Sequence, residues 1–533
     1  MESAPTDRPL RILLISLALL YCWPNYAFFH DNLVYATQVM HSDWAQKCHP
    51  HHLGYGPTIW SLWTLIGHAI NPLFLMVAIS RIAAWGLAWQ TSRWTREWEW
   101  PLPVQLLAVA IAGTAYGLWS YGTNGAVYAP AAFAVGMALW IVRDDCGRRA
   151  VNRAALWLWI AVMFHQLAIF GVVPIAYALH RHWVDGGYRL RGWWLSVGLL
   201  LLAPSALTYV VVYAAIANSF KIPAFINWLT RYSHQGKWWW WEQIPQGTSP
   251  FGYWISQVVG SHARLFWATP FGQLVDPTSH VPLLAAWQRL WTTPILAILA
   301  AVLGVIALLW ILGTVRQLAS AQSSLLLWWI APFLLFTLFW DPLNAGYRLY
   351  YLAPLVLLIL APLATSGMRP RLPAALRVFT ALLVFTLSLN LAYGWEPLSH
   401  PRVNPLYHDL DGLRELDPTM PLVVGGPGQP DWLEAAYLEV FLPNPLYSVT
   451  WEKPLRYEPK FQGGDPGTAT IALSAALESG FRESAESDKQ QPILIVPLSS
   501  DAPHWWCQAA DWPPVTVAES GVYRFVLLEH AGH

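Results

Sequence analysis

The stretch FFHDNLVYATQVMHSDWAQKCHPHHLGYGPTIW, from Phe28 to Trp60, directly follows an apolar run and is unusually polar. It holds two aspartates, one lysine and five histidines. Charge is scarce elsewhere, because charged residues make up 12% of the chain, against about 25% in soluble domains. The hydrophobic share is 55%. This composition predicts a membrane protein that concentrates its polar groups in loops outside the bilayer.

Apolar runs predict about eleven membrane spans, since a helix needs roughly 20 residues to cross a bilayer. The runs lie at residues 11–29, 72–90, 103–121, 127–142, 154–165, 167–179, 193–217, 294–315, 323–340, 349–363 and 376–393. The two runs between Ala154 and Leu179 could instead form one long tilted helix, which would reverse the topology of everything after it. The first run has no small-residue cleavage site, so we interpret it as a retained helix.

Loop charge favours the eleven-span topology. With eleven spans, the arginines of the loops fall on one side of the membrane, which the positive-inside rule makes the cytoplasm. They are Arg8, Arg11, Arg93, Arg96, Arg143, Arg148, Arg149, Arg153, Arg181, Arg189, Arg191, Arg316, Arg369, Arg371 and Arg377. The N-terminus is then cytoplasmic, and loops 30–71 and 218–293 and the residues after Gly394 are extracytoplasmic. We expect a multi-pass protein of the cell inner membrane.

The C-terminal part predicts a separate water-soluble domain. The segments PLVVGG, PILIVPL and VYRFVLLE have the pattern of strands, and DWLEAAYLEVFL has that of a helix. The predicted fold is therefore a mainly α polytopic bundle over residues 1–394, followed by an extracytoplasmic α/β domain over residues 395–533.

Asp31 stands at the mouth of the first span. A carboxylate near hydrocarbon costs a few kcal/mol unless it has a partner or a wet cleft. It is either a helix-capping residue or a general base or metal ligand. The HPHH sequence at His49–His52 has no helical i, i+4 pair, and the four cysteines have no CxxC spacing, so neither a metal nor any other cofactor is indicated. Neutralisation of a phosphate by the imidazoles and Lys47 fits a loop at the membrane surface better.

The order of these elements resembles the GT-C glycosyltransferases. The resemblance rests on a retained first helix, an outer loop that opens with Asp, an HPxxxGY element at His49–Tyr55, a short interfacial helix at Thr58–Ile70 and a second span. It is greatest to the protein O-mannosyltransferase and aminoarabinose transferase branch, including bacterial members with DSGEF and HPPGYP loops. It continues at YGTNGAVYAP (121–130), where relatives carry AEVYAL, at MFHQLAIFGVVP (163–174) and at DPLNAGYRLYYLAP (341–354).

The resemblance implies transfer of a hexose or pentose from a polyprenyl phosphate, usually with inversion, to a hydroxyl on the outer face. Asp31 would be the general base. Arg348 would grip the phosphate, and His165 and Gln166 would lie at the tip between two half-length spans. The implied donor-binding residues are His49, His52, Tyr55, Asn124, Tyr128, His165, Gln166 and Arg348. The alternatives are an interfacial snorkelling arginine at position 348 and a packing histidine at position 165.

The sequence also departs from the family pattern. Asn32, Leu33 and Val34 follow Asp31, so the second acid of the DSGE element is absent, and the glutamate of AEVYAL is Ala126. Asn124 fills a similar space but cannot act as a base. A tightly held divalent ion is therefore not indicated. The expected partners are a polyprenyl-phosphate sugar donor, a glycan, lipid or protein hydroxyl acceptor, and membrane lipid, with no nucleic acid.

Other functional classes stay open. An O-antigen ligase or polymerase also uses polyprenyl donors, but it places its catalytic groups in one large late loop. A lipid or solute transporter usually has two matching halves and ionisable groups at mid-bilayer, and the sequence has no internal repeat. A non-catalytic GT-C-like assembly protein is favoured only by the missing second acid.

Overall fold

The computed structural model describes most of the membrane half and the strands of the C-terminal part. The described residues are 8–41, 44–185, 193–217, 220–234, 239–244, 249–268, 321–342, 344–364, 372–400, 422–425, 440–441, 446–449, 493–497, 514–520 and 523–528. The chain divides into two compact units. The first comprises residues 1–25, 44–70 and 74–397, and the second residues 26–43, 71–73 and 398–533. The unit that holds the C-terminal strands therefore also takes in the segment around Asp31.

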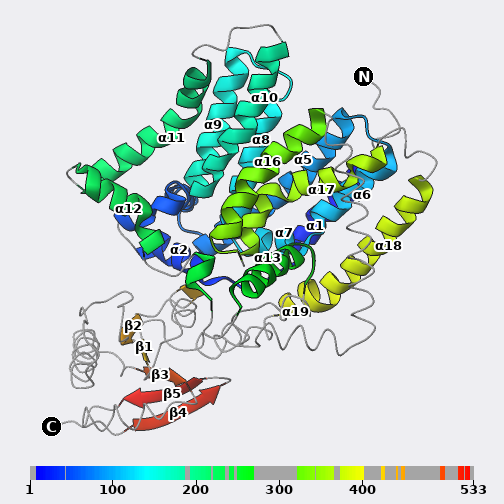
Figure 1. The fold of residues 1–533 in the computed structure, drawn as a ribbon. Coiled ribbons are helices and arrows are strands. Elements are labelled where there is room, and N and C mark those ends of the chain that lie inside the picture. Colours follow the sequence, from blue (N-terminus) through cyan, green and yellow to red (C-terminus); the bar gives the residue numbers. More distant parts are fainter. Residues whose placement is uncertain are drawn as a thin grey trace, which may run out of the picture. The chain divides into compact units, whose positions relative to one another are not determined.

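Helices make up the described part of the first unit (Figure 1). They are α1 (Arg8–Cys22), α3 (Trp44–Lys47), α4 (Tyr55–Leu65), α5 (Pro72–Glu97), α6 (Leu102–Gly113), α7 (Tyr116–Thr123), α8 (Tyr128–Val142), α9 (Arg148–Phe164), α10 (Val172–Asp185), α11 (Trp193–Ala217), α12 (Ile222–His234), α13 (Pro250–Phe266), α16 (Ala321–Phe339), α17 (Leu349–Ala364), α18 (Leu372–Asn390) and α19 (Glu396–Leu398). Shorter turns are η2 (Pro50–His52), η3 (Gln166–Gly171), η4 (Trp240–Glu242), η6 (Ala345–Arg348) and the π-helical η8 (Leu391–Trp395). The predicted interfacial helix at residues 58–70 is α4, which begins and ends earlier.

The helix α8 lies at the centre of the bundle and packs against α9, α10 and α17. Its sequence YAPAAFAVGMALWIV is rich in alanine, and ten of its residues are buried. Small side chains let neighbouring helices approach closely, which is the main way membrane helices gain packing contacts. Figure 1 shows α8, α9, α10 and α16 side by side. The alanine-rich run thus explains why this helix forms the core of the unit.

Six described helices are long and apolar enough to cross a membrane, and a seventh span is obtained if α6 and α7, bent by 50°, count as one. Ten of the eleven predicted runs coincide with a helix or a helix pair, and the run at residues 294–315 lies outside the described residues. Three of the ten, at α1, α8 and α9, are helices of 15, 15 and 17 residues. The chain is a multi-pass helical membrane protein as predicted, while the count of eleven stays a prediction.

The chain reverses direction at His165. This residue has an extended backbone (φ −158°, ψ 122°) between the end of α9 and the start of η3. Near the end of α10, the His182 imidazole Nε2 lies 2.5 Å from the carbonyl oxygen of Arg143. Arg143 is the C-cap residue of α8, and α9 begins shortly after it. α10 therefore returns to the end of the bundle from which α9 started. The two runs between Ala154 and Leu179 are separate antiparallel elements, and the single tilted helix is excluded.

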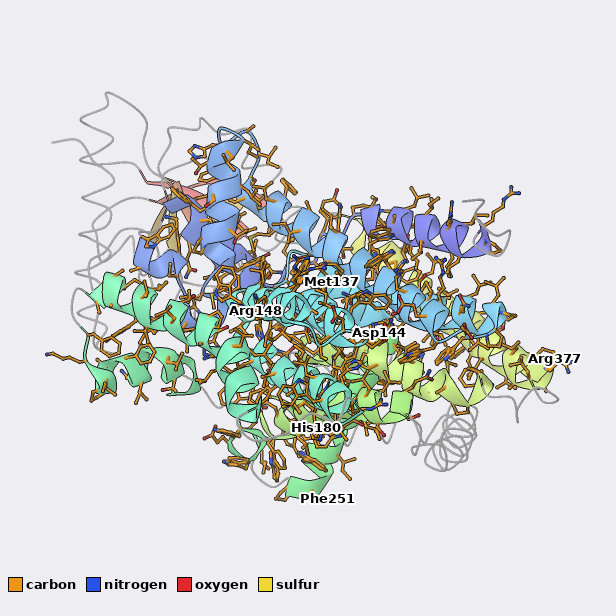
Figure 2. All side chains as sticks on the ribbon, turned by 90° about the horizontal axis from the view of Figure 1, so that it is seen from above. Met137, Asp144, Arg148, His180, Phe251 and Arg377 are labelled. Atoms are coloured by element: carbon orange, nitrogen blue, oxygen red, sulfur yellow. The ribbon has the colours of Figure 1, made fainter. Side chains whose placement is uncertain are left out.

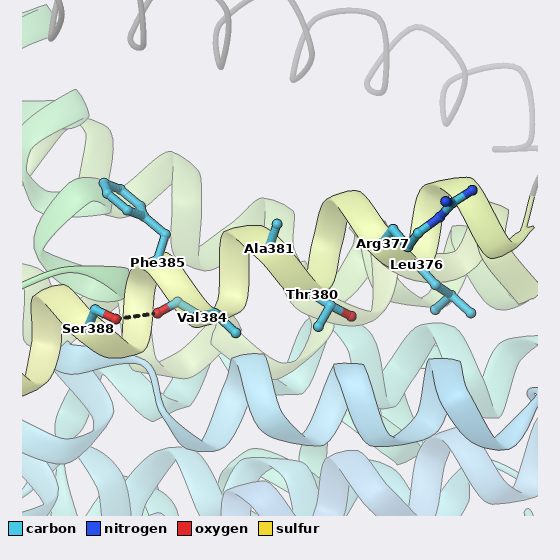
Figure 3. A pocket seen from close by; sticks show the side chains of 7 residues that line it. All are labelled: Leu376, Arg377, Thr380, Ala381, Val384, Phe385 and Ser388. Carbon is cyan, nitrogen blue, oxygen red and sulfur yellow. Dashed lines mark hydrogen bonds between the residues drawn. The ribbon is translucent and has the colours of Figure 1, made fainter.

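The helix α18 is the least enclosed of the candidate spans, because none of its 18-residue apolar window is buried. A shallow groove of about 710 Å³ runs along it from Leu376 and Arg377 to Ser388 (Figure 3). Figure 2 shows Arg377 and Phe251 at the rim of the unit, on α18 and α13 respectively. The exposed side chains of Val384 and Phe385 are apolar, as expected for a helix face in contact with lipid.

The second unit contains α2 (His30–His41) and a five-stranded sheet. The strands are β1 (Leu422–Gly425), β2 (Leu446–Val449), β3 (Ile493–Pro497), β4 (Pro514–Ser520) and β5 (Tyr523–Leu528), in the order β2-β1-β3-β5-β4. β1 is parallel to β2 and β3, with Leu422 paired to Leu446 and Ile493. β5 is antiparallel to β3 and β4.

Three of these strands coincide with predicted ones. PLVVGG, PILIVPL and VYRFVLLE contain β1, β3 and β5, whereas β2 and β4 were not predicted. Apart from Val440 and Phe441, the predicted helix at residues 431–442 lies outside the described residues. Parallel pairing of β1 with both neighbours requires crossover connections, which is typical of the α/β class that the sequence predicted.

Buried polar side chains close the bend between α6 and α7. The bend leaves carbonyl groups without helical partners, and no water reaches such groups in a bilayer. Tyr21 Oη donates to the Gly113 carbonyl at 2.7 Å. Asn390 Nδ2 donates to the carbonyls of Thr114 at 3.0 Å and Phe266 at 2.9 Å, and Asn390 Oδ1 accepts from the Ala268 amide at 2.7 Å. One buried asparagine therefore joins the bend to the ends of α13 and α18.

We expect Asn390→Ala to destabilise the protein by about 2–4 kcal/mol, because it leaves two buried carbonyls and one amide without partners. The measurement is thermal unfolding of the purified protein in detergent. Ser388→Ala is the matched control on the same helix, since this exposed hydroxyl only donates to the Val384 carbonyl at 2.9 Å (Figure 3). Equal melting temperatures for the two variants would contradict the bracing role of Asn390.

Candidate functional site

The HPxxxGY element docks on the end of α9. The Gly54 amide donates to the Met163 carbonyl at 2.8 Å, and His52 Nδ1 lies 3.2 Å from the Phe164 carbonyl oxygen. Because a carbonyl only accepts, Nδ1 of His52 carries the hydrogen. A Cβ atom on Gly54 would lie 2.8 Å from Met163 Cβ, so a larger residue would push the loop away. The element thus satisfies the last carbonyl groups of α9, which have no partner within the helix.

The same element braces the turn between α7 and α8. Tyr55 is 1% exposed, and its hydroxyl donates to the Gly125 carbonyl at 2.7 Å. Gly125 has a φ of 90°, which side chains rarely permit, and it is the last residue before Ala126. Ser80 Oγ donates to the Ala126 carbonyl at 2.7 Å. Tyr55 therefore contacts protein backbone, although it was predicted to bind the donor.

Asn124 holds the same turn from the other side. It is fully buried, and its Oδ1 accepts from the Ala126 amide at 3.2 Å. The alanine at position 126, where relatives carry glutamate, is also buried. The structure thus places Asn124 as a turn-forming residue next to the position of the missing acid.

A cluster of aromatic rings surrounds His165, which is 5% exposed. Its ring centroid lies 4.9 Å from that of His52, 5.0 Å from Tyr128, and 5.8 Å from both Tyr347 and Tyr350. His165 Nδ1 and Tyr350 Oη are buried and have no hydrogen-bond partner among the described residues. The cluster joins the η2 loop, α8, the end of α9, η6 and α17, and it contains three of the predicted donor-binding residues, namely His52, Tyr128 and His165.

Two further predicted residues lie beside this cluster. His49 stacks on His52 with ring centroids 5.8 Å apart, and its imidazole Nδ1 accepts from the His51 amide at 3.3 Å. Gln166 is half-buried and follows His165 as the first residue of η3. Five of the predicted residues, His49, His52, Tyr128, His165 and Gln166, therefore lie together around the chain reversal at His165.

The loop histidines are held neutral. Burial lowers the pKa of His51 to about 3, with a smaller effect from the charge of His49. Burial also lowers the pKa of His52 well below its usual value. The charges of His165, His49 and His51 lower it further by smaller amounts, whereas the hydrogen bond to Phe164 raises it. These two imidazoles carry no charge at neutral pH. This argues against the prediction that they neutralise a phosphate, although a neutral imidazole still donates one hydrogen bond.

Arg348 is completely buried at the end of η6. Its Nε and Nη2 donate to Ser261 Oγ at 3.1 and 3.0 Å, and Nη2 also donates to the carbonyls of Pro342 at 2.7 Å and Thr337 at 3.4 Å. Nη1 has no hydrogen-bond partner among the described residues. The guanidinium therefore ties η6 to α13 and α16, and the snorkelling alternative is excluded because no part of the side chain is exposed.

Polar residues of α13 face η6 and α17, and the sequence analysis missed them. His262 Nδ1 donates to the Val258 carbonyl at 2.8 Å, so its Nε2 accepts from the hydroxyl of Tyr351 at 3.0 Å. Burial, followed by the charge of Arg348, lowers the pKa of His262 to about 4. On the same helix, Arg264 interacts electrostatically with Tyr121. The signal in the sequence was the run GSHARLF at residues 260–266, which places three polar groups within four residues of this helix.

Asp31 belongs to the second unit. It is the second residue of α2, its side chain is exposed, and it lies in the first turn, where the positive end of the helix dipole favours a carboxylate. The Asn32 and Leu33 amides donate to the Phe29 carbonyl at 3.1 and 3.3 Å. Phe29, and not Asp31, thus occupies the capping position. The catalytic role of Asp31 stays a prediction.

No group of three or more His, Cys, Asp or Glu side chains in the described part of the chain is arranged to hold a metal ion.

No protein-family model matches the chain, and no curated protein matches it by sequence. Solved structures of ArnT share its fold. ArnT from Cupriavidus metallidurans in the apo state has a TM-score of 0.55 and 12% identity over 98% of this chain and 98% of that chain. The same protein bound to undecaprenyl phosphate has a TM-score of 0.54 and 15% identity over 97% and 98%. An oligosaccharyltransferase from Archaeoglobus fulgidus has a TM-score of 0.44 and 14% identity over 91% and 68%.

The chain shares the fold of ArnT, since the match spans nearly the whole of both chains. The predicted resemblance is confirmed at the level of the fold. Membership of the GT-C glycosyltransferases and the branch within them stay predictions.

The lowered histidine pKa values predict a pH-dependent stability. The unfolded chain takes up protons below about pH 6.5 while folded His51 and His52 do not, so stability is fully present above that pH and falls as the pH drops towards 3. His52→Asn keeps a donor for the Phe164 carbonyl but cannot be protonated. Between pH 7 and pH 5, we expect the free energy of unfolding of this variant to fall by about 2 kcal/mol less than that of the wild type, measured by thermal unfolding.

Tyr55→Phe separates titration from packing in the same experiment. It removes the bond to Gly125 but no titrating imidazole, so it should lower the melting temperature by a similar amount at both pH values. A His52→Asn protein with the full wild-type pH dependence would contradict the neutral state of His52.

Proposed function

We propose that the protein is an integral-membrane glycosyltransferase that transfers a sugar from a polyprenyl-phosphate donor to a hydroxyl acceptor at the extracytoplasmic face. The observation that carries the proposal is the fold match to ArnT bound to undecaprenyl phosphate, over 97% of this chain. The motifs in matching order along the sequence support it. The sugar is a hexose or pentose, and the acceptor is a glycan, lipid or protein.

The proposed reaction needs one base and a stabilised leaving group. The acceptor hydroxyl attacks the anomeric carbon, its proton passes to the Asp31 carboxylate, and the bond from that carbon to the phosphate oxygen breaks with its electron pair leaving on the polyprenyl phosphate. Asp31 is the only acid between Asp7 and Asp43, it opens the outer loop, and its exposed side chain is open to an acceptor.

The donor would lie against the residues around His165. Tyr128, Tyr347 and Tyr350 present ring faces and hydroxyls there, and the unpaired His165 Nδ1 and Tyr350 Oη would gain partners from sugar hydroxyls. Of the Arg348 guanidinium, Nη1 is the nitrogen without a protein partner among the described residues, so a phosphate bound by Arg348 would be held through Nη1.

The proposed orientation is that of a multi-pass protein in the cell inner membrane. The arginine-rich loops and the N-terminus are cytoplasmic, and the C-terminal domain is periplasmic. The support is the distribution of arginines between alternate loops.

A non-catalytic GT-C-like assembly protein is the second candidate. The observation that favours it is local: position 126 is an alanine, and His52, Tyr55, Asn124 and Arg348 all brace the backbone. A ligase or polymerase and a transporter are the remaining alternatives, and no contact among the described residues favours either.

Asp31→Asn tests the general base. The amide keeps the shape but removes the basicity, so we expect sugar transfer to fall by about 10²- to 10⁴-fold with stability nearly unchanged. The assay follows transfer from a labelled polyprenyl phosphate in reconstituted membranes, with thermal stability measured in parallel. Glu99→Gln, at another exposed acid, is the control and should transfer at the wild-type rate. Wild-type transfer by the Asp31→Asn protein would overturn Asp31 as the general base, whereas no transfer by the unmodified protein would favour the assembly role.

Arg348→Lys tests the donor grip. Lysine keeps the charge but loses the fork that reaches Ser261 and Pro342, so both the melting temperature and donor use should fall. Ser261→Ala keeps the guanidinium and removes only the hydroxyl, so it should lower the melting temperature while the donor KM stays near wild type. If Arg348→Lys changes stability alone, the residue is a structural brace and does not bind the donor.

A further inference from the structure

A polar pocket of about 310 Å³ lies at the end of the bundle opposite the His165 reversal. Trp98 just after α5, Arg143 at the end of α8, Arg181 and His182 on α10, and Gln322 at the start of α16 line it. Its size is near the lower limit of small-molecule pockets, which is about 300 Å³. The pocket is formed where four helices end at the arginine-rich face.

Arg143 is fixed at the wall of this pocket. Its guanidinium carbon lies 5.0 Å from the centroid of Trp94 and 4.4 Å from that of Trp140, and the side chain is ion-paired with Glu97 and Asp144. Only 12% of the side chain is exposed. Nη1 is buried and has no hydrogen-bond partner among the described residues. The charge is therefore held in place with one nitrogen still able to donate.

The ends of α8 and α10 are tied together beside the pocket. His182 Nε2 donates to the Arg143 carbonyl at 2.5 Å. Because Arg181 directly precedes His182 on α10, this bond also holds Arg181 near Arg143. The described residues that line the pocket include two arginines, Arg143 and Arg181, and one acid, Asp144, whose side chain is 69% exposed. The two arginines thus come from separate helices, the first from the end of α8 and the second from α10.

An apolar surface continues from the pocket towards the membrane interior. One turn before Arg181, Tyr177 stacks on Trp328 of α16, with ring centroids 5.6 Å apart. Trp328 is 48% exposed. α10 and α16 pack against each other along this line, and both belong to candidate membrane spans. A ligand with a charged head and an apolar tail matches this order of surfaces.

We propose that the pocket binds the glycerophosphate headgroup of an anionic phospholipid, of the phosphatidylglycerol or cardiolipin type, from the cytoplasmic leaflet. Its phosphate accepts from the guanidinium groups of Arg143 and Arg181, and an acyl chain lies along Tyr177 and Trp328. Basic pockets between membrane helices on the cytoplasmic side are suited to such headgroups, because the arginine fork matches phosphate oxygens. The site is distinct from the proposed donor site, and its assignment to the cytoplasmic leaflet rests on the orientation proposed above.

The test measures lipid binding to the full-length protein by native mass spectrometry from detergent. The probes are phosphatidylglycerol, cardiolipin and phosphatidylcholine with the same acyl chains. We expect the two anionic lipids to bind more tightly than phosphatidylcholine, and Arg181→Gln to weaken their binding about five- to tenfold. Arg377→Gln, at an arginine on the rim of α18, is the matched control and should bind like wild type (Figure 2).

Arg181→Gln is preferred to a change at Arg143, because Arg143 contacts the rings of Trp94 and Trp140 and its loss would also disturb their packing. Equal lipid affinity in the Arg181→Gln and Arg377→Gln proteins would overturn the proposal, as would the absence of a preference for anionic lipids. Glycerol 1-phosphate and inorganic phosphate form a further arm, read as thermal shifts. A stabilisation by either one equal to that by phosphatidylglycerol would also overturn the lipid assignment.

Discussion

The constraint on which the membrane unit depends is that every carbonyl freed by a break in a buried helix needs a donor from the protein. The breaks follow α6, α7, α9 and α16; the first three are closed from a distant part of the chain and the fourth from the turn η6 that directly follows it. Asn390 reaches the first, Tyr55 the second, His52 the third and Arg348 the fourth. Without these donors the broken helices would leave unpaired polar groups in hydrocarbon, which costs several kcal/mol for each group.

The same constraint explains why residues that resemble catalytic ones are so deeply engaged in the fold. A half-length span ends inside the protein, so its last carbonyls lie where a membrane enzyme would place its substrate. The side chains that satisfy them then line the same region, as His52 does beside His165. Structural and functional demands therefore fall on the same positions. Burial alone does not show whether such a residue braces the fold or binds the donor. A comparison of the Ser261→Ala and Arg348→Lys variants distinguishes the two roles.

The sequence predicted the helices well, because an apolar run of span length has few other interpretations. The reversal at His165 was among the two topologies allowed by the runs at 154–179, and loop charge selected it correctly. β2 and β4 were missed since four residues of LYSV and the polar-interrupted PVTVAES give weak strand signals. The hydrogen-bond partners of Arg348 could not be predicted from the sequence for a different reason. Ser261 lies 87 residues away in sequence, and nothing in the local pattern says which helix faces η6.

The neutral loop histidines change how a charged donor would have to be held. With the pKa of His51 at about 3 and that of His52 also lowered, the imidazoles give directional hydrogen bonds but no charge. Compensation of a phosphate would then fall to Lys47, Arg264 and Arg348, which come from α3, α13 and η6. Lys47 is 9% exposed and Arg348 is completely buried, so the positive charges stand in a low-dielectric setting where they act strongly on an anion. Such an arrangement takes its charge from ammonium and guanidinium groups, whereas a cluster of ordinary histidines would lose its charge near pH 6.5.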